Sequence, residues 1–223
     1  MDQDLILDFE ENPIAGINEA NVLYKIWTRP KDTIHFLLKN HPGKYMPILL
    51  VLGGISSAIS KWSEKNDVGA EGFWLGMVYA TVGGALLGWI FYYIYAWALS
   101  ATGKWLKGTG TAIEMRTVVS WSLIPSIVTL LLIVPEEYFS MRINDMLYAD
   151  YMERESLFLM EEIALYLVIA MEVILAIWGI YISIEGVSYV QGFSRWKSFG
   201  NLILPILVLI IPVFIVVFIF ASL

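Results

Sequence analysis

The sequence contains no cysteine, which excludes disulfides, thiolate metal sites and cysteine nucleophiles. It also lacks any Asn-x-Ser/Thr sequon, the acceptor for N-glycosylation. Basic residues are scarce: 14 Lys and Arg stand against 21 Asp and Glu, and the net charge is −7. Nucleic acid is therefore not an expected partner, because contacts with phosphates require a basic surface.

The first 20 residues lack Lys and Arg altogether. Six of the acidic residues lie there: Asp2, Asp4, Asp8, Glu10, Glu11 and Glu19. A secretory signal peptide begins with a basic segment and continues with an apolar one, so this start does not resemble a signal peptide. The segment has too few apolar residues to offset the entropy lost on ordering. We therefore expect residues 1–20 to form a mobile acidic tail.

Five long stretches of a chain that is 58% hydrophobic have almost no charged residues. Four of them contain no charged residue, and the remaining one, the fourth in chain order, contains only Glu172. The five runs are Tyr45–Ser60, Phe73–Leu99, Thr117–Val134, Ile163–Ile184 and Asn201–Leu223. A membrane-crossing helix needs roughly 17 to 25 apolar residues, and the first run meets this only marginally. The sequence predicts an all-α integral membrane bundle of five transmembrane helices over residues 45–223.

The positions of Lys and Arg predict the orientation, because basic loops are retained on the cytoplasmic side. Ten of the 14 precede the first run or lie in the second and fourth loops. The first and third loops hold only four: Lys61, Lys65, Arg142 and Arg154. We expect a multi-pass membrane protein with its amino terminus in the cytoplasm and its carboxyl terminus outside.

Residues 21–44 have apolar side chains at helical spacing beside Lys31 and Lys39. Pro30 suits the first position of a helix. This pattern predicts one or two short helices in an interfacial amphipathic segment. An amphipathic segment folded back on the bundle explains the pattern equally well. The third loop, Pro135–Ser156, is long enough to hold a short surface helix of its own.

A packing face is predicted on the second helix, where small residues recur at steps of four. Its members are Gly72, Gly76, Ala80, Gly84 and Gly88. Small residues at this spacing let another backbone approach closely. Gly53 and Ser57, with Gly54 and Ala58, form a smaller version on the first helix. The simpler interpretation is packing within one chain, and the alternative is a homodimer face.

Glu172 is a candidate polar site, because its run places it near the middle of the bilayer. Glu161 and Ser183 lie eleven residues on either side of it and share its helix face. Ser126 and Thr129 are candidate hydrogen-bond partners at comparable depth. An intramembrane acid can bind a proton or cation, or it can be a neutral structural donor. No second charge lies within the runs to complete a relay, which favours the structural role.

No other pattern indicates chemistry. Gly103, Gly108 and Gly110 lack the Gly-Lys-Ser/Thr and preceding strand of a phosphate-binding loop. His35 and His41 have no clustered carboxylate pair, so no metal site is expected. No nucleophile, base and orienting group gather at one depth. We therefore expect no cofactor, no metal and no enzymatic activity.

Four stretches resemble the bacterial branch of the Yip domain family, the Ypt/Rab-interacting membrane proteins. They are WTRPKDTIHFLL at Trp27–Leu38, the second helix running into Gly103–Arg116, SWSLIPSIVTLLL at Ser120–Leu132, and FSRWKSFGNLILP at Phe193–Pro205. The likeness covers about residues 27–223 and rests on the order of these features. It implies a five-helix membrane protein with a cytosolic amino terminus, located in a bacterial cytoplasmic membrane.

Eukaryotic members of the family are associated with small GTPases and with traffic between the endoplasmic reticulum and the Golgi. Their Asp-Leu-Tyr-Gly-Pro and Gly-Tyr-Pro motifs do not occur here, so the resemblance carries over no functional residue. The expected function is a non-enzymatic protein that organises the bilayer or partner membrane proteins. The alternative is a transporter or channel that uses Glu172 as a proton or cation site.

Overall fold

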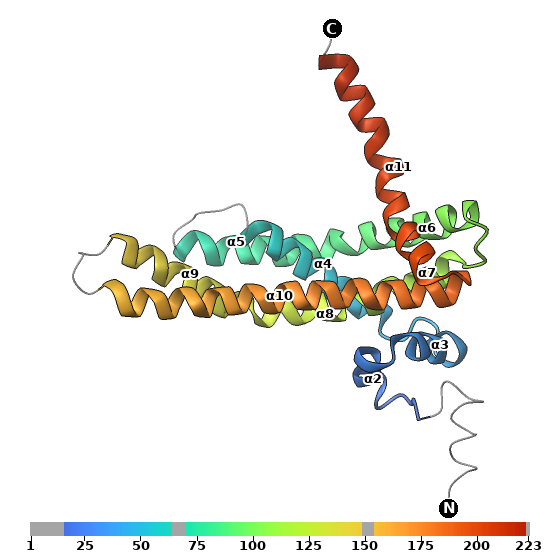
Figure 1. Cartoon of the computed structure of the whole chain (residues 1–223), viewed down its shortest axis with the longest axis horizontal. Helices are drawn as coiled ribbons and strands as arrows, with labels where there is room; N and C mark the ends of the chain where they lie inside the picture. Colours follow the sequence, from blue (N-terminus) through green and yellow to red (C-terminus); the bar gives the residue numbers. More distant parts are fainter. Residues whose placement is uncertain (1–15, 64–69, 149–153, 222–223) are drawn as a thin grey trace, which may run out of the picture. The chain divides into compact units, whose positions relative to one another are not determined.

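The computed structural model describes residues 16–63, 70–148 and 154–221, so residues 1–15 of the predicted acidic tail lie outside it. The described chain is all α-helical and contains no strand, as the sequence predicts (Figure 1). Its α-helices are α2 (Val22–Thr28), α3 (Pro30–Asn40), α4 (Met46–Ser63), α5 (Ala70–Gly83), α6 (Trp89–Trp105), α7 (Ala112–Ser122), α8 (Ile124–Val128), α9 (Ile133–Tyr148), α10 (Arg154–Gln191) and α11 (Arg195–Ala221). A π-helical turn, η1 (Gly84–Gly88), joins α5 to α6, and a 3-10 turn, η2 (Thr129–Leu131), follows α8.

Three helical segments are long and apolar enough to cross a membrane, among the residues that the structure describes. They are Trp74–Trp105, Ala112–Ile143 and Leu159–Gln191. The first predicted crossing corresponds to a shorter apolar helix, Met46–Trp62. The last predicted run, Asn201–Leu223, falls on α11, whose side chains are described only as far as Ile210. Three of the five predicted crossings therefore have a matching long apolar helix.

The chain divides into two compact units. Unit 1 comprises Met1–Leu50, Trp89–Ser122 and Tyr181–Leu223, and unit 2 comprises Val51–Gly88 and Leu123–Ile180. Two helices, α4 and α10, contribute residues to both units.

The core of unit 1 forms where α6 packs against α7 and α11, and where α3 packs against α7. Leu37, Leu99 and Trp121 are completely buried there. The indole Nε1 of Trp121 donates a hydrogen bond to the Lys44 carbonyl at 3.3 Å, which ties α7 to the segment before α4. The amphipathic segment thus forms two short helices, and α3 lies against a helix of the bundle.

The core of unit 2 centres on Ile59 of α4 and Ile133 of α9, which are both buried. Side chains from α4, α5, η2 and α9 pack around them: Ile55, Trp62, Met77, Ala80, Leu130 and Met141. This cluster holds α4, α5 and α9 together.

Two helix boundaries differ from those that the uncharged runs indicate. The third loop, expected from Pro135 onward, is helical through Tyr148, so only residues 149–153 separate α9 from the start of α10. The fourth run ends before Glu185, yet α10 continues to Gln191. Glu185 is 3% exposed and pairs with Arg195 at the start of α11, so its charge does not end the helix.

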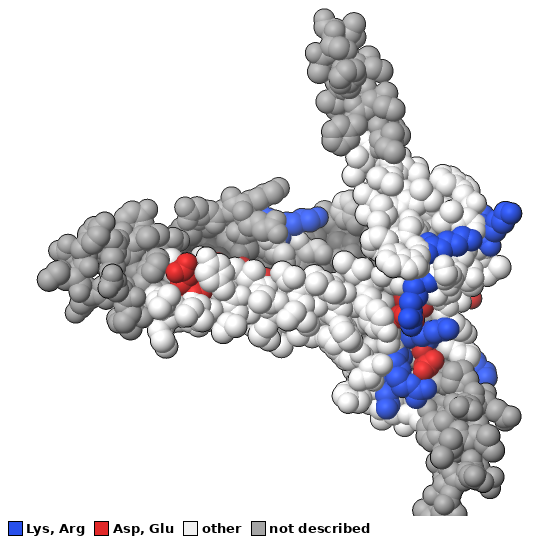
Figure 2. Space-filling model, viewed as in Figure 1, with Lys and Arg blue, Asp and Glu red and all other residues white. Residues whose placement is uncertain are grey.

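The basic residues gather in unit 1 (Figure 2). All ten Lys and Arg that the sequence analysis assigned to the cytoplasmic side belong to this unit: Lys25, Arg29, Lys31, Lys39, Lys44, Lys104, Lys107, Arg116, Arg195 and Lys197. Trp105 and Trp196 belong to the same unit and are 66% and 85% exposed. Exposed Trp beside basic residues is typical of a membrane–water boundary.

Candidate functional site

A close contact between helix backbones lies in unit 2, between α4 and the π-turn η1. A Cβ atom on Gly84 would lie 2.6 Å from the carbonyl oxygen of Gly54, and one on Gly88 would lie 2.4 Å from the Gly54 Cα. A Cβ on Gly54 would in turn lie 2.6 Å from the Gly84 carbonyl oxygen. Because these neighbours are backbone atoms, only glycine fits at the three positions. The contact is made within one chain.

The other members of the predicted face have different surroundings. Gly76 is buried, and a Cβ there would overlap the indole of Trp62. Ala80 packs on the Ile59 cluster, whereas Gly72 is exposed. Gly83, next to the contact, has open space around it. Four of the five predicted residues thus take part in packing inside unit 2.

Glu172 of α10 interacts with a second acidic residue, Glu136 of α9. The two carboxyl groups are coupled by a side-chain hydrogen bond and by charge, and both residues are half-buried. A hydrogen bond between carboxyl groups requires a proton on one of them, because an ionised carboxylate has no donor. The sequence places no second charge within the uncharged runs, and Glu136 lies two residues beyond the end of the run Thr117–Val134. Because Glu136 follows Pro135, the sequence predicts it in a loop and not as a partner of Glu172.

The remaining predicted site residues make other contacts. Glu161 pairs with Arg142 of α9, with Nε and Oε1 3.3 Å apart. The hydroxyl of Thr129 donates to the Ser126 carbonyl at 2.7 Å, and Ser56 of α4 donates to the same carbonyl at 2.6 Å. The Ser126 hydroxyl lies 3.2 Å from the Ser56 hydroxyl, so within the described residues the hydroxyls of Ser126 and Thr129 bond to α4 and to their own turn rather than to Glu172. Ser183 belongs to unit 1.

Unit 1 contains a buried amide, Gln191, that the sequence analysis did not single out. Its Oε1 accepts a hydrogen bond from the Gly110 amide at 2.9 Å, and its Nε2 donates to the Leu99 carbonyl at 3.3 Å. Cβ atoms on Gly103 and Gly108 would lie 1.9 Å and 2.2 Å from this side-chain amide. The glycines that superficially resemble a phosphate loop thus make room for Gln191.

Asn201 of α11 extends this amide cluster. Its Nδ2 donates to the Leu99 carbonyl at 3.2 Å, and its Oδ1 accepts from the Thr102 hydroxyl at 3.0 Å. Both amides are at most 2% exposed, and their hydrogen bonds connect α6, α10 and α11. The sequence signal for this cluster is three closely spaced glycines together with two amide residues, one at the end of α10 and one in the second turn of α11.

No group of three or more His, Asp and Glu side chains that could hold a metal ion occurs among the described residues. The polar features that the structure does bring together are the carboxyl pair in unit 2 and the amide cluster in unit 1. The first can hold a proton or a cation, and the second joins helices.

A family model described as the Yip1 domain matches residues 24–217, which is well over half of the chain. Neither a curated protein nor a solved structure matches the chain.

Proposed function

Because the chain belongs to the Yip1 domain family, we propose that it is a non-enzymatic multi-pass membrane protein that organises the bilayer or partner membrane proteins around it. The proposal includes the finer expectations from the sequence: the bacterial branch of the family, five crossings, a cytoplasmic-membrane location and a cytoplasmic amino terminus. The gathering of ten basic residues in unit 1 supports this orientation, since such residues are retained in the cytoplasm.

The organising role rests on the difference between two sets of residues on α5 and η1, the small ones that pack inside unit 2 and the large apolar ones that are exposed. The small residues of this segment pack inside unit 2, as Gly84 and Gly88 do against Gly54. The large apolar residues point away from the unit, and Tyr79 and Leu86 are 70% and 64% exposed. Helices locked to each other on one side keep a constant apolar surface on the other, and such a surface can hold lipids or partner helices.

Photo-crosslinking tests this role. A crosslinking amino acid replaces Leu87, which is 59% exposed, in the full chain in its native membrane. We expect discrete adducts, either with membrane proteins or with lipids of one headgroup class. The same group at Ile174 of α10, 61% exposed, shows whether the contact is confined to α5 and η1. Lipid adducts that match the bulk membrane at both positions, without protein adducts, would contradict the proposal.

A transporter or channel is the second candidate function, and the contact between Glu136 and Glu172 favours it. Two carboxyl groups that share a proton can exchange it, or can bind a cation when both are ionised. The pair supplies the second acidic group that a relay needs.

Flux through liposomes separates the two functions. The organising role predicts no proton or cation flux above that of protein-free liposomes. It also predicts that Glu172→Gln leaves the thermal unfolding temperature nearly unchanged, because the amide can still donate to Glu136. Flux that is present in the native chain and lost in a stably folded Glu172→Gln variant would replace the organising role with transport. Glu162→Gln, on the same helix, serves as the matched control.

A further inference from the structure

Unit 1 contains an open pocket with a volume of about 420 Å³. Three helices supply its lining: His35, Leu38 and Lys39 come from α3, Glu114 from α7, and Tyr189 and Val190 from α10. The volume falls within the range of small-molecule sites, roughly 300 to 1,000 Å³. None of these residues belongs to the carboxyl pair or to the amide cluster.

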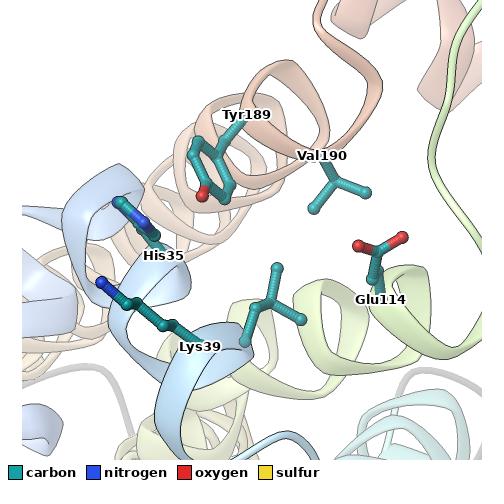
Figure 3. Close-up of a pocket in the computed structure, with 6 residues that line it drawn as sticks. His35, Lys39, Glu114, Tyr189 and Val190 are labelled. Atoms are coloured by element: carbon teal, nitrogen blue, oxygen red, sulfur yellow. The ribbon is translucent and has the colours of Figure 1, made fainter.

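One side of the pocket carries hydrogen-bond donors. The rings of His35 and Tyr189 stack with their centroids 4.9 Å apart, and Lys39 lies one helical turn beyond His35 on α3 (Figure 3). Lys39 forms no ion pair with any residue that the structure describes. An ammonium, an imidazole and a phenol in one place can together donate to the oxygens of a phosphate ester.

The opposite side carries a carboxylate, Glu114 (Figure 3). Its Oε2 accepts hydrogen bonds from the backbone amide of Thr111 at 2.8 Å and from the Thr111 hydroxyl at 2.7 Å. This is a capping box at the start of α7, and it fixes the position of the carboxylate. A carboxylate held there can pair with a cation in the pocket.

The pocket lies near the ends of two candidate membrane spans. Glu114 lies two residues inside the start of Ala112–Ile143, and Tyr189 lies two residues before the end of Leu159–Gln191. The ends of membrane spans lie in the headgroup layer, where phosphate esters and amines of lipids are concentrated. The pocket thus presents a cation, Lys39, and an anion, Glu114, in the layer where lipid headgroups carry an anionic phosphate and a cationic amine.

We propose that this pocket binds the zwitterionic headgroup of a phospholipid that carries a phosphate diester and a primary ammonium. The phosphate contacts the donors of His35, Lys39 and Tyr189. The ammonium pairs with Glu114. Lipid binding at this pocket is tested independently of the organising role, because binding is measured on the purified chain alone.

The test uses the full chain in detergent micelles and measures retention of phosphatidylethanolamine and phosphatidylglycerol by native mass spectrometry. Lys39→Met removes the cation that faces the phosphate and should weaken retention of both lipids about fivefold. Glu114→Gln should weaken retention of phosphatidylethanolamine by a similar factor and leave phosphatidylglycerol unchanged. Glutamine still accepts the capping hydrogen bond, so α7 keeps its start. Lys31→Met, on α3 but outside the pocket lining, is the matched control.

Three outcomes would overturn the proposal. Equal losses in Lys31→Met and Lys39→Met would mean that a general basic surface attracts lipid. Equal effects of Glu114→Gln on both lipids would remove the ammonium contact. Displacement of the lipid by an equal concentration of soluble phosphoethanolamine would identify a water-soluble ligand instead. Thermal unfolding of each variant, expected to match that of the native chain, separates these outcomes from misfolding.

Discussion

Gly54 and Gly88 lie so close that a Cβ atom on Gly88 would stand 2.4 Å from the Cα of Gly54. This contact between α4 and η1 leaves no room for any side chain on either residue. It explains why a π-turn that consists of Gly84–Gly88 begins and ends with glycine.

Gly88→Ala should therefore destabilise the protein. The added methyl group meets backbone that cannot rotate away, and overpacking of this kind costs about 1 to 3 kcal/mol. Gly83→Ala is the matched control, since a Cβ at Gly83 has nothing within 4 Å and alanine favours a helix over glycine. Thermal unfolding in detergent measures both variants. Equal losses at the two positions would contradict the role of this contact.

Gln191→Leu should also destabilise the protein, by about 1 to 3 kcal/mol. The variant leaves the buried amide of Gly110 without its side-chain acceptor, whereas the carbonyl of Leu99 keeps the hydrogen bond from the side-chain amide of Asn201. Thr109→Val is the control. Thr109 precedes Gly110 in the loop between α6 and α7, is exposed and loses only a hydrogen bond of 3.5 Å, so this variant should be nearly neutral. The measurement is thermal unfolding, and a neutral Gln191→Leu would show that the amide cluster adds no stability.

The contact of Glu19 with the segment before α4 should depend on pH. A hydrogen bond from Lys44, with the charges of His41 and Lys44, holds the pKa of the Glu19 carboxyl below its ordinary value of 4.5. The ionised carboxylate therefore stabilises the contact fully above pH 4.5, and this stabilisation is lost as the pH falls through the lowered pKa. Carbon NMR of the Glu19 side chain measures the titration. Lys44→Met should return the midpoint toward 4.5, and an unshifted midpoint in the native chain would refute the contact.

Reporter fusions test the five-crossing topology. Fusions after Trp105 and Trp196 should report the cytoplasm, and fusions after Asp67 and Asp145 should report the opposite side, because ten of the 14 basic residues flank the first pair of sites or precede the first run. A reversed signal at any one site would break the model of five crossings.

The sequence predicts some contacts of this protein well and others not at all. Steps of four between small residues indicate that α5 and η1 approach another backbone, because that spacing lies on one face of any helix. Only the register of that face distinguishes Gly84, which has no space for a side chain, from Gly83, which has open space around it. Glu136 was missed for a different reason: its position next to Pro135 suggests a loop, and only the tertiary structure brings it next to Glu172.

The sequence by itself determined the all-α class, the apolar stretches and the basic residues that gather in unit 1. These properties follow from local composition, since the cost of placing charge in lipid applies to each residue separately. The tertiary structure alone decided that Glu172 meets Glu136, that three glycines surround Gln191 and that α3 contributes to a charged pocket with α7 and α10. Such contacts join residues far apart in the chain, and they depend on how helices pack rather than on any periodicity within one helix.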